Sequence, residues 1–366
     1  MLSQYNNIDA LYIHIPFCIK KCDYCDFLSF QLEKDTEKKY AKYLLEELSM
    51  YSDYIYNTIY IGGGTPSVIE PDNIKILLES INIKPDSEIT IEVNPKTVDI
   101  EKLRQYRNMG INRISIGIQS FDNKKLHILG RAHNVLEGKE AYFNARKAGF
   151  DNISLDLIFS TPNETMEELK NDLRELFFLE PQHFSIYSLI WEEGTVFYEK
   201  LNQGIFQITD NDLEGEMYNL IIEEANKYNY KHYEISNFSK DEYKSKHNIK
   251  YWENKNYVGV GLGASGYINN ERYTNNLTFE EYYKNIDNGI FPRGHIEIVD
   301  KNEKEKYRAI LNLRLLTEGY FPTEKNHIKL CKTLERKNLL KRNVNGKYVL
   351  TKNGLFIAND VMEVFL

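Results

Sequence analysis

The sequence predicts an α/β protein: a partial (β/α)6 barrel, like an eightfold (β/α) barrel left open, followed by a small, mainly helical, winged-helix-like C-terminal domain. Three observations predict this fold. Segments with strand character alternate with helical segments through the first half of the chain. Side chains suited to chemistry follow these strands, at the ends where barrel sites form. Beyond residue 200 the alternation stops, and the last part of the chain indicates helices and a short hairpin.

Apolar residues at strand and helix spacing predict the elements of the first half. In chain order, the expected strands are Ala10–Phe17, Thr58–Ile61, Glu88–Val93, Arg113–Ile118, Ile153–Phe159 and His183–Leu189. The helices expected between them are Glu33–Met50, Pro71–Ile81, Val98–Met109, Val135–Ala148 and Glu164–Leu179. Because strands joined by helices of this length form βαβ units, we expect the strands to be parallel.

The second half predicts fewer repeated units. A long helix is expected over Asp210–Tyr228 and a glycine-rich strand or turn within Tyr257–Ile268. Helices are expected near Glu303–Leu316 and Thr323–Lys337, and a strand and helix from Tyr348 onwards. We therefore divide the chain into a barrel core (residues 1–200), a barrel-completing region (201–295) and a C-terminal domain (296–366).

Composition limits the classes of function. A net charge of −8 argues against a general nucleic-acid surface. No apolar run approaches the roughly 18 residues of a membrane span, so we expect at most a peripheral membrane contact. Residues 1–7 lack the basic start and apolar core of a signal peptide. Three of four cysteines lie close together, which fits a reducing compartment better than a disulfide scaffold. We expect a cytoplasmic protein, and the sequence indicates no oligomeric state.

Cys18, Cys22 and Cys25 form a CxxxCxxC run directly after the first strand, and the fourth cysteine is distant, at Cys331. A 4Fe-4S cluster has four irons and normally takes four cysteines. Three cysteines leave one iron without a protein ligand, so that iron can bind a substrate or cofactor. The run predicts a 4Fe-4S cluster with one open iron.

Zinc is the alternative for the same run. His14 precedes Cys18 by four residues, so a histidine and three cysteines could close a tetrahedral site. His14 lies within an apolar strand, however, and would have to turn back onto the loop that follows it. The cluster is therefore favoured, and zinc remains an open alternative.

A glycine-rich segment follows the second strand. Gly62, Gly63 and Gly64 allow positive φ angles and a close approach of the backbone to a ligand. Thr65 precedes Pro66 and is therefore held in an extended conformation. Such loops are often only tight turns, but this one lies one strand from the cysteines.

Taken together, these motifs resemble those of radical S-adenosylmethionine (SAM) proteins, specifically the oxygen-independent coproporphyrinogen III oxidase-like family. The resemblance spans nearly the whole chain. Besides the cysteine run, it rests on His14–Cys18, Gly62–Pro66, Glu92–Pro95, Gly117–Phe121, Leu129–Arg131, Ser154–Leu157, Tyr187–Leu189, Tyr233–Phe238 and His247–Trp252.

The resemblance implies a fold of the radical SAM type, SAM bound at the open iron and an electron donor for the cluster. It also implies which residues bind. The three cysteines would hold the cluster, and Tyr12, Tyr24, Gly63, Gly64, Thr65, Glu92, Gln119, Arg131 and Asp156 would form the SAM site. Carboxylates there can accept hydrogen bonds from ribose hydroxyls or an ammonium, and an arginine can pair with an acidic group.

Two branches of this family differ beside the cysteines. The oxidases, which decarboxylate two propionates of coproporphyrinogen III, carry a further cysteine two positions after the third. This chain has Phe27 there, as does the HemW-type branch of haem chaperones, whose members bind haem and pass it to acceptor proteins. The resemblance thus implies a chaperone with His247 as a haem ligand; the oxidase is the alternative. From the residues alone, His247 is better explained as a surface or hydrogen-bonded structural histidine, and only the resemblance brings the haem-ligand interpretation level with it.

Overall fold

The computed structural model describes residues 8–366 of the chain, so the expectation about a signal peptide falls on residues outside the described part. A nine-stranded sheet forms its centre, in the order β11-β1-β4-β5-β6-β7-β8-β10-β9. The six strands from β1 to β8 in this order are all parallel. They are β1 (Ala10–Ile15), β4 (Ile55–Gly63), β5 (Asn82–Val93), β6 (Arg113–Gln119), β7 (Asn152–Phe159) and β8 (His183–Ser188).

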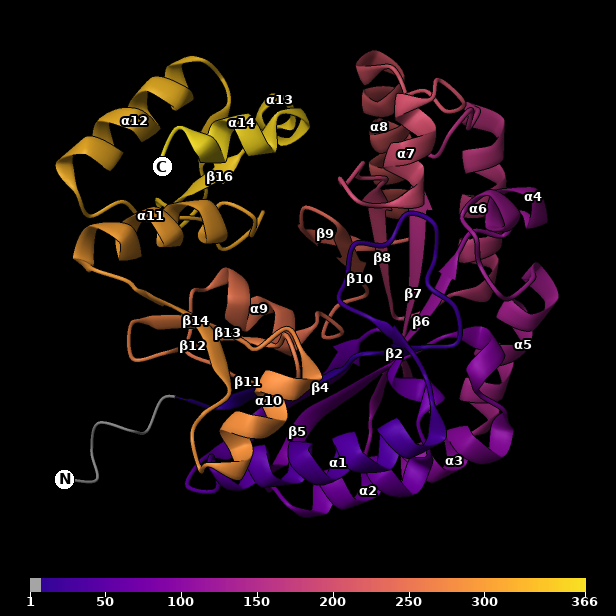
Figure 1. Cartoon of the computed structure of the whole chain (residues 1–366). Helices are drawn as coiled ribbons and strands as arrows, with labels where there is room; N and C mark the ends of the chain where they lie inside the picture. Colours follow the sequence, from indigo (N-terminus) through magenta and orange to yellow (C-terminus); the bar gives the residue numbers. More distant parts are fainter. Residues whose placement is uncertain (1–7) are drawn as a thin grey trace.

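Helices connect these parallel strands, and all but the short α4 lie where the sequence predicts them. They are α1 (Lys34–Ser49), α2 (Pro71–Glu79), α3 (Ile100–Asn108), α4 (Asn123–Ile128), α5 (Val135–Lys147) and α6 (Met166–Leu179). In Figure 1, α1, α2 and α3 lie side by side along the outside of the sheet. The open (β/α)6 arrangement is therefore confirmed.

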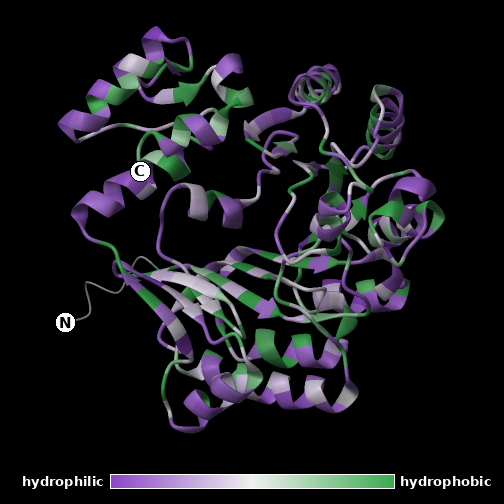
Figure 2. Cartoon of the chain, turned by 45° about the horizontal axis from the view of Figure 1, so that its top comes forward, coloured by the Kyte–Doolittle hydropathy of each residue, from purple (hydrophilic) through white to green (hydrophobic). Residues whose placement is uncertain are grey.

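Alternation along the strands separates an apolar outer layer from a polar inner one. In β6, for example, Ile114 and Ile116 join the main hydrophobic core under the helices, while Arg113 and Ser115 face the other way. The same pattern recurs in β1, β4, β5, β7 and β8, and Figure 2 shows strand ribbons banded in hydrophobic and hydrophilic colours. The inside of the barrel thus collects polar side chains from every strand.

Three strands extend the predicted six. β11 (Val258–Val260) comes from the glycine-rich segment and pairs in parallel with β1. At the other edge, β10 (Asn237–Ser239) and β9 (Lys231–Glu234) add antiparallel strands beyond β8. The segment that forms β11 was expected as a strand or turn, but β9 and β10 were not predicted, because runs of three or four residues carry too little periodicity. Helices α7 (Val196–Asn202) and α8 (Asn211–Lys227) lie between β8 and β9, and α9 (Lys246–Trp252) lies between β10 and β11.

The rest of the chain forms two smaller units. A three-stranded sheet, β12 (Ser265–Ile268), β13 (Glu271–Asn275) and β14 (Arg293–Ile298), accompanies α10 (Phe279–Asp287). Residues beyond it form a C-terminal domain with its own hydrophobic core. Its elements are α11 (Lys301–Asn312), α12 (Lys325–Arg336), β15 (Leu340–Arg342), β16 (Tyr348–Leu350), α13 (Lys352–Phe356) and α14 (Ala358–Glu363). The exact domain limits stay a prediction. Within residues 8–366, no helix combines the length and apolar character needed to cross a membrane.

Candidate functional site

The three clustered cysteines lie at the carboxyl ends of the parallel strands. Cys18 ends the short strand β2 (Phe17–Cys18), which pairs with β3 (Phe30–Gln31). Residues 19–29 between them, here called the cysteine loop, carry Cys22 and Cys25. Because β2 pairs with β3, the two ends of this loop lie side by side. All three thiols therefore lie in the loop or at its first end.

Each thiol has its own surroundings. The Cys18 sulfur lies 3.5 Å from the Thr65 hydroxyl, and the Arg131 guanidinium donates to the Cys22 sulfur at 3.3 Å. Burial raises the pKa of Cys25 to about 11. Within residues 8–366, no three His, Cys, Asp or Glu side chains are arranged to hold a metal ion. The donor set, three cysteines, fits a 4Fe-4S cluster with one open iron.

The geometry of His14 bears on the zinc alternative. Its Nδ1 lies 2.8 Å from the Tyr12 hydroxyl and its Nε2 3.4 Å from the Leu28 carbonyl oxygen, so both ring nitrogens have partners. The ring also contacts the backbone of the glycine segment: a Cβ on Gly63, whose φ is +118°, would lie 2.7 Å from it. The His14 ring therefore packs between β1 and the glycine segment, where it can support that segment.

The glycine segment lies directly against a half-buried carboxylate. The Gly63 N–H donates to Glu92 at 3.2 Å, and the Tyr60 hydroxyl donates to the other oxygen of Glu92 at 2.7 Å. Burial raises the pKa of Glu92 to about 7, while these two hydrogen bonds oppose the rise. Glu92 is thus a carboxyl group near the end of β5, which accepts hydrogen bonds from Tyr60 and Gly63 and has a pKa near neutral pH.

Gln119 and Arg131 meet above the next strand. The Arg131 guanidinium donates to the Gly117 carbonyl at 2.8 Å. A Cβ on Gly117 would lie 3.0 Å from the Gln119 amide nitrogen and 3.3 Å from Arg131, so this glycine makes room for both side chains. Gln119 has a φ of +65°, a left-handed conformation uncommon for a residue with a side chain. Burial raises the pKa of Tyr24, and the Arg131 guanidinium beside it opposes that rise.

Asp156, in β7, heads a chain of buried hydrogen bonds. Ser115 and Ser154 both donate to its carboxylate, at 2.9 and 3.3 Å. The Ser154 hydroxyl lies 2.8 Å from His183 Nδ1, and His183 Nε2 lies 2.9 Å from the Tyr233 hydroxyl. With the proton on Nδ1, every bond in this chain points its donor towards Asp156. Burial raises the pKa of Asp156, and these hydroxyls oppose the rise.

His247 lies apart from the cysteines, in α9. It is fully buried; its Nδ1 lies 3.0 Å from the Thr58 hydroxyl and its Nε2 2.7 Å from the Tyr251 hydroxyl. Its ring packs 5.4 Å from that of Tyr60, the residue that donates to Glu92. Burial lowers the pKa of His247 to about 3, so the ring is neutral. Tyr60 therefore contacts both His247 and Glu92, the carboxyl group near the end of β5.

Several inner-layer residues escaped the sequence-based prediction. Tyr60, Arg113, Ser154, His183 and Tyr233 all lie buried or half-buried among the residues described above. Four of them had a signal in the sequence: polar side chains at every second position of strands that are otherwise apolar. Tyr233 had none, because the four residues of β9 are mostly polar. Arg113 is the basic group among them, and its charge lowers the pKa values of Glu92 and Asp156 against the effect of burial.

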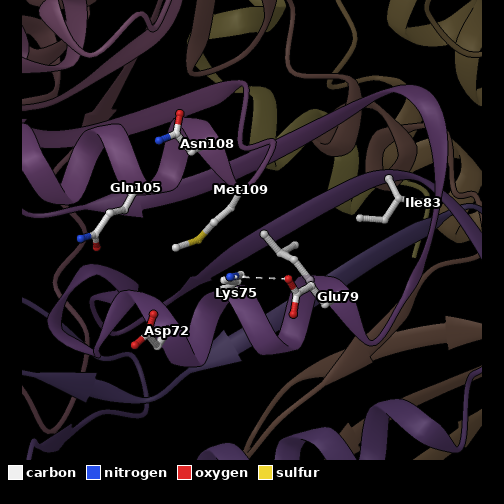
Figure 3. Close-up of a pocket in the computed structure, with 8 residues that line it drawn as sticks. Asp72, Lys75, Glu79, Ile83, Gln105, Asn108 and Met109 are labelled. Carbon is white, nitrogen blue, oxygen red and sulfur yellow. Dashed lines mark ion pairs between the residues drawn. The ribbon is translucent and has the colours of Figure 1, made fainter.

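A surface hollow of about 450 Å³ lies elsewhere, between α2 and α3 (Figure 3). Lys75 and Glu79 form an ion pair at 3.9 Å on its wall. Ile83, at the start of β5, and Met109, after α3, also line it, so it opens at the amino ends of the strands. It is separate from the cysteine loop.

Comparison with known proteins agrees with this geometry. Residues 12–176 match the radical SAM superfamily. The protein named heme chaperone HemW of Lactococcus lactis is 34% identical over 98% of this chain and 97% of its own length. The protein of the same name from Bacillus subtilis is 33% identical over 98% and 99%. In fold, the chain resembles coproporphyrinogen III oxidase (HemN) of Escherichia coli, a radical SAM enzyme, with a TM-score of 0.83 at 19% identity, covering 99% of this chain and 91% of that one.

Proposed function

Because this chain belongs to the radical SAM superfamily and, within it, to the HemW family, we propose that it is a haem chaperone. It binds a 4Fe-4S cluster, SAM and haem, and it delivers haem to acceptor proteins. The observation that carries this proposal is full-length similarity to relatives named heme chaperone HemW, combined with a three-cysteine loop at the strand ends.

The residues present fit the cluster and SAM. Cys18, Cys22 and Cys25 would hold the cluster and leave one iron for SAM. Together the two groups supply one-electron radical chemistry when bound. Tyr12 and Tyr24 would line the SAM site.

The remaining predicted residues would orient SAM. Gly63, Gly64 and Thr65 offer a backbone that a ligand can approach closely. Glu92 can accept hydrogen bonds from an ammonium, and Asp156, fixed by its serines, can accept from ribose hydroxyls. Gln119 and Arg131 would complete the same site, and Arg131 also donates to the Cys22 sulfur.

Haem would be cargo, bound near α9. His247 is neutral and therefore able to ligate iron, but its Nε2 is held by the Tyr251 hydroxyl. Ligation through Nε2 requires that this bond give way, whereas ligation by another residue leaves it intact.

The proposed partners are haem, haem-accepting proteins and an electron donor for the cluster. All four cysteines are free thiols, which supports action in a reducing compartment such as the cytoplasm.

The alternative is a coproporphyrinogen oxidase, favoured by the overall fold alone. Phe27, 63% exposed beside Cys25, stands where those enzymes carry a further cysteine.

An anaerobic reconstitution separates the two. The chaperone predicts about four irons per chain and a Soret band that saturates near one haem per chain. The oxidase predicts conversion of coproporphyrinogen with SAM and reductant. Product formation without haem binding would overturn the proposal, as would a chain that binds neither iron nor haem. The His232→Ala variant is the control for nonspecific haem contact: it removes a histidine outside α9 that stacks on Phe238, and its Soret band should match that of the unchanged protein.

A further inference from the structure

Three ionisable side chains are buried together behind the candidate site. Lys125 of α4 donates to Asp172 of α6 at 2.9 Å and also to Glu164, just before α6. Their side chains are 7%, 3% and 0% exposed. One cation therefore holds two carboxylates in the protein interior, at the turns that follow β6 and β7.

The two carboxylates are fully used at strand-to-helix turns. Asp172 accepts from the Ser120 hydroxyl at 2.9 Å and from the Phe121 N–H at 2.6 Å. These are the residues directly after Gln119, with its φ of +65°. Glu164 accepts from the backbone and hydroxyl of Thr161, at 2.9 and 3.0 Å. The group of three therefore ties the turn after β6 to the turn after β7.

The other end of α4 reaches the cysteine loop. Gly130, with a φ of +70°, packs so closely on Asp23 of the loop that a Cβ would lie 2.6 Å from its carboxylate. The Asp23 N–H donates to the Leu129 carbonyl at 3.4 Å, and Arg131 donates to the Cys22 sulfur at 3.3 Å. Helix α4 is thus fixed at Lys125 by the two carboxylates, and the residues directly after it, 129–131, contact the cysteine loop.

A structural role alone explains this group poorly. A buried ion group gains little net stability over apolar residues of the same size, because desolvation offsets the attraction. What it supplies here is position, since each carboxylate bonds to a turn as well as to Lys125. A helix of six residues cannot hold itself in place.

We propose that Lys125, Asp172 and Glu164 are positioning residues that fix the turn after Gln119 and hold Arg131 against the cysteine loop. Their role towards the cluster and SAM rests on the proposed function; their role towards the loop itself does not. The two parts can be tested separately.

The first test uses the full-length protein without cluster. Lys125→Met and Asp172→Asn are each treated with N-ethylmaleimide under reducing, oxygen-free conditions, and labelling of Cys22 is followed by peptide mass spectrometry. We expect Cys22 to react about fivefold faster in both variants, because the loop opens more often. Lys139→Met is the matched control: Lys139 pairs with Glu175 of the same helix α6 at 2.7 Å, but its own helix, α5, carries no residue of the 129–131 contact. Lys125→Arg, which keeps the charge, should label within about twofold of the unchanged protein.

The second test uses reconstituted protein and measures SAM binding by equilibrium dialysis. We expect the dissociation constant to rise by about tenfold in Asp172→Asn and to be unchanged in Lys139→Met. If Lys125→Met does not fold, Asp172→Asn decides both tests. Cys22 labelling that matches the control in both variants would overturn the proposal. If the unchanged protein assembles no cluster, the proposed function fails while the labelling result still decides the role of the three residues.

Discussion

Glu92 is a carboxyl group whose ionisation the protein opposes. It lies half-buried in β5, close to the carboxylate of Asp156, and its compensating contacts are the Tyr60 hydroxyl, the Gly63 N–H and the charge of Arg113. Desolvation outweighs these contacts and raises its pKa to about 7, from about 4.5 in an unfolded chain. A site built to receive a cationic ligand has this property: without the ligand, the anion lacks a full partner.

We therefore predict a pH dependence of stability that depends on Glu92. Below pH 4.5 the group is neutral in both states; between pH 4.5 and 7 the unfolded chain ionises and the folded protein does not. Stability from this group is thus complete at low pH and is lost as pH rises towards 7. In urea unfolding of cluster-free protein, the unchanged chain should lose about 2 kcal/mol more between pH 5 and pH 8 than Glu92→Gln. Glu47, a buried carboxyl group with a pKa also raised to about 7, is common to both proteins and cancels in the difference. Equal losses in the two proteins would contradict the prediction.

At the residue scale, Glu92 and Asp156 stand out in the sequence because both are charged residues within apolar strands, and their binding role stays a prediction. Their partners were harder to predict. Tyr60, Ser154 and His183 follow the same two-residue alternation, but tyrosine, serine and histidine are common on ordinary strand faces. Nothing local says that His183 meets Tyr233, fifty positions away, because that contact depends on how β8, β10 and β9 pair.

At the scale of elements, α9 shows how a short helix is made by its surroundings. Seven residues do not form a stable helix alone. Glu88 of β5 accepts from the N–H groups of Lys246 and His247, at 3.1 and 3.0 Å, and Lys250 pairs with Asp9 at 2.9 Å. The sequence-based prediction missed this helix for that reason, as it missed α4 and α7, whereas the long helices α1, α6 and α8 were predicted within two residues at each end.

We predict that the Tyr251 hydroxyl competes with haem iron for His247. If iron binds Nε2, Tyr251→Phe removes that competitor and the dissociation constant for haem should fall by roughly two- to tenfold, the value of one hydrogen bond. Titration followed at the Soret band measures this. Tyr257→Phe is the control, since it removes a neighbouring hydroxyl and leaves both bonds of His247 in place. A dissociation constant that Tyr251→Phe leaves unchanged, or raises, would exclude Nε2 as the ligand.

At the scale of the whole molecule, the C-terminal domain is fastened to the barrel around α9. Asn312 donates to the Trp252 carbonyl at 2.7 Å, and the Leu316 N–H donates to the Tyr233 carbonyl at 3.0 Å. Arg314 lies over the Trp252 ring, 4.4 Å from its centre. In Figure 1 this domain stands above α9. Helix α9, which carries His247, is thus held between the barrel interior and the C-terminal domain. A movement of α9 would therefore change its contacts with both parts.

Arg314 is the contact whose loss should separate the two parts. Besides Trp252, it faces Glu234 at 3.8 Å, a carboxylate with no exposed surface. Burial raises the pKa of Glu234, and the Arg314 charge opposes that rise.

We predict that Arg314→Met destabilises the docked arrangement by about 2–4 kcal/mol, since it removes a cation–π contact and leaves a buried carboxylate without its cation. In calorimetry, the C-terminal domain should then unfold in a separate transition below that of the barrel. Arg342→Met removes a similar contact, 4.7 Å from the Tyr348 ring, inside the C-terminal domain, and should leave the two parts coupled. If both variants unfold with the same number of transitions and the same midpoints, Arg314 does not couple the parts, and α9 would be held by the barrel alone.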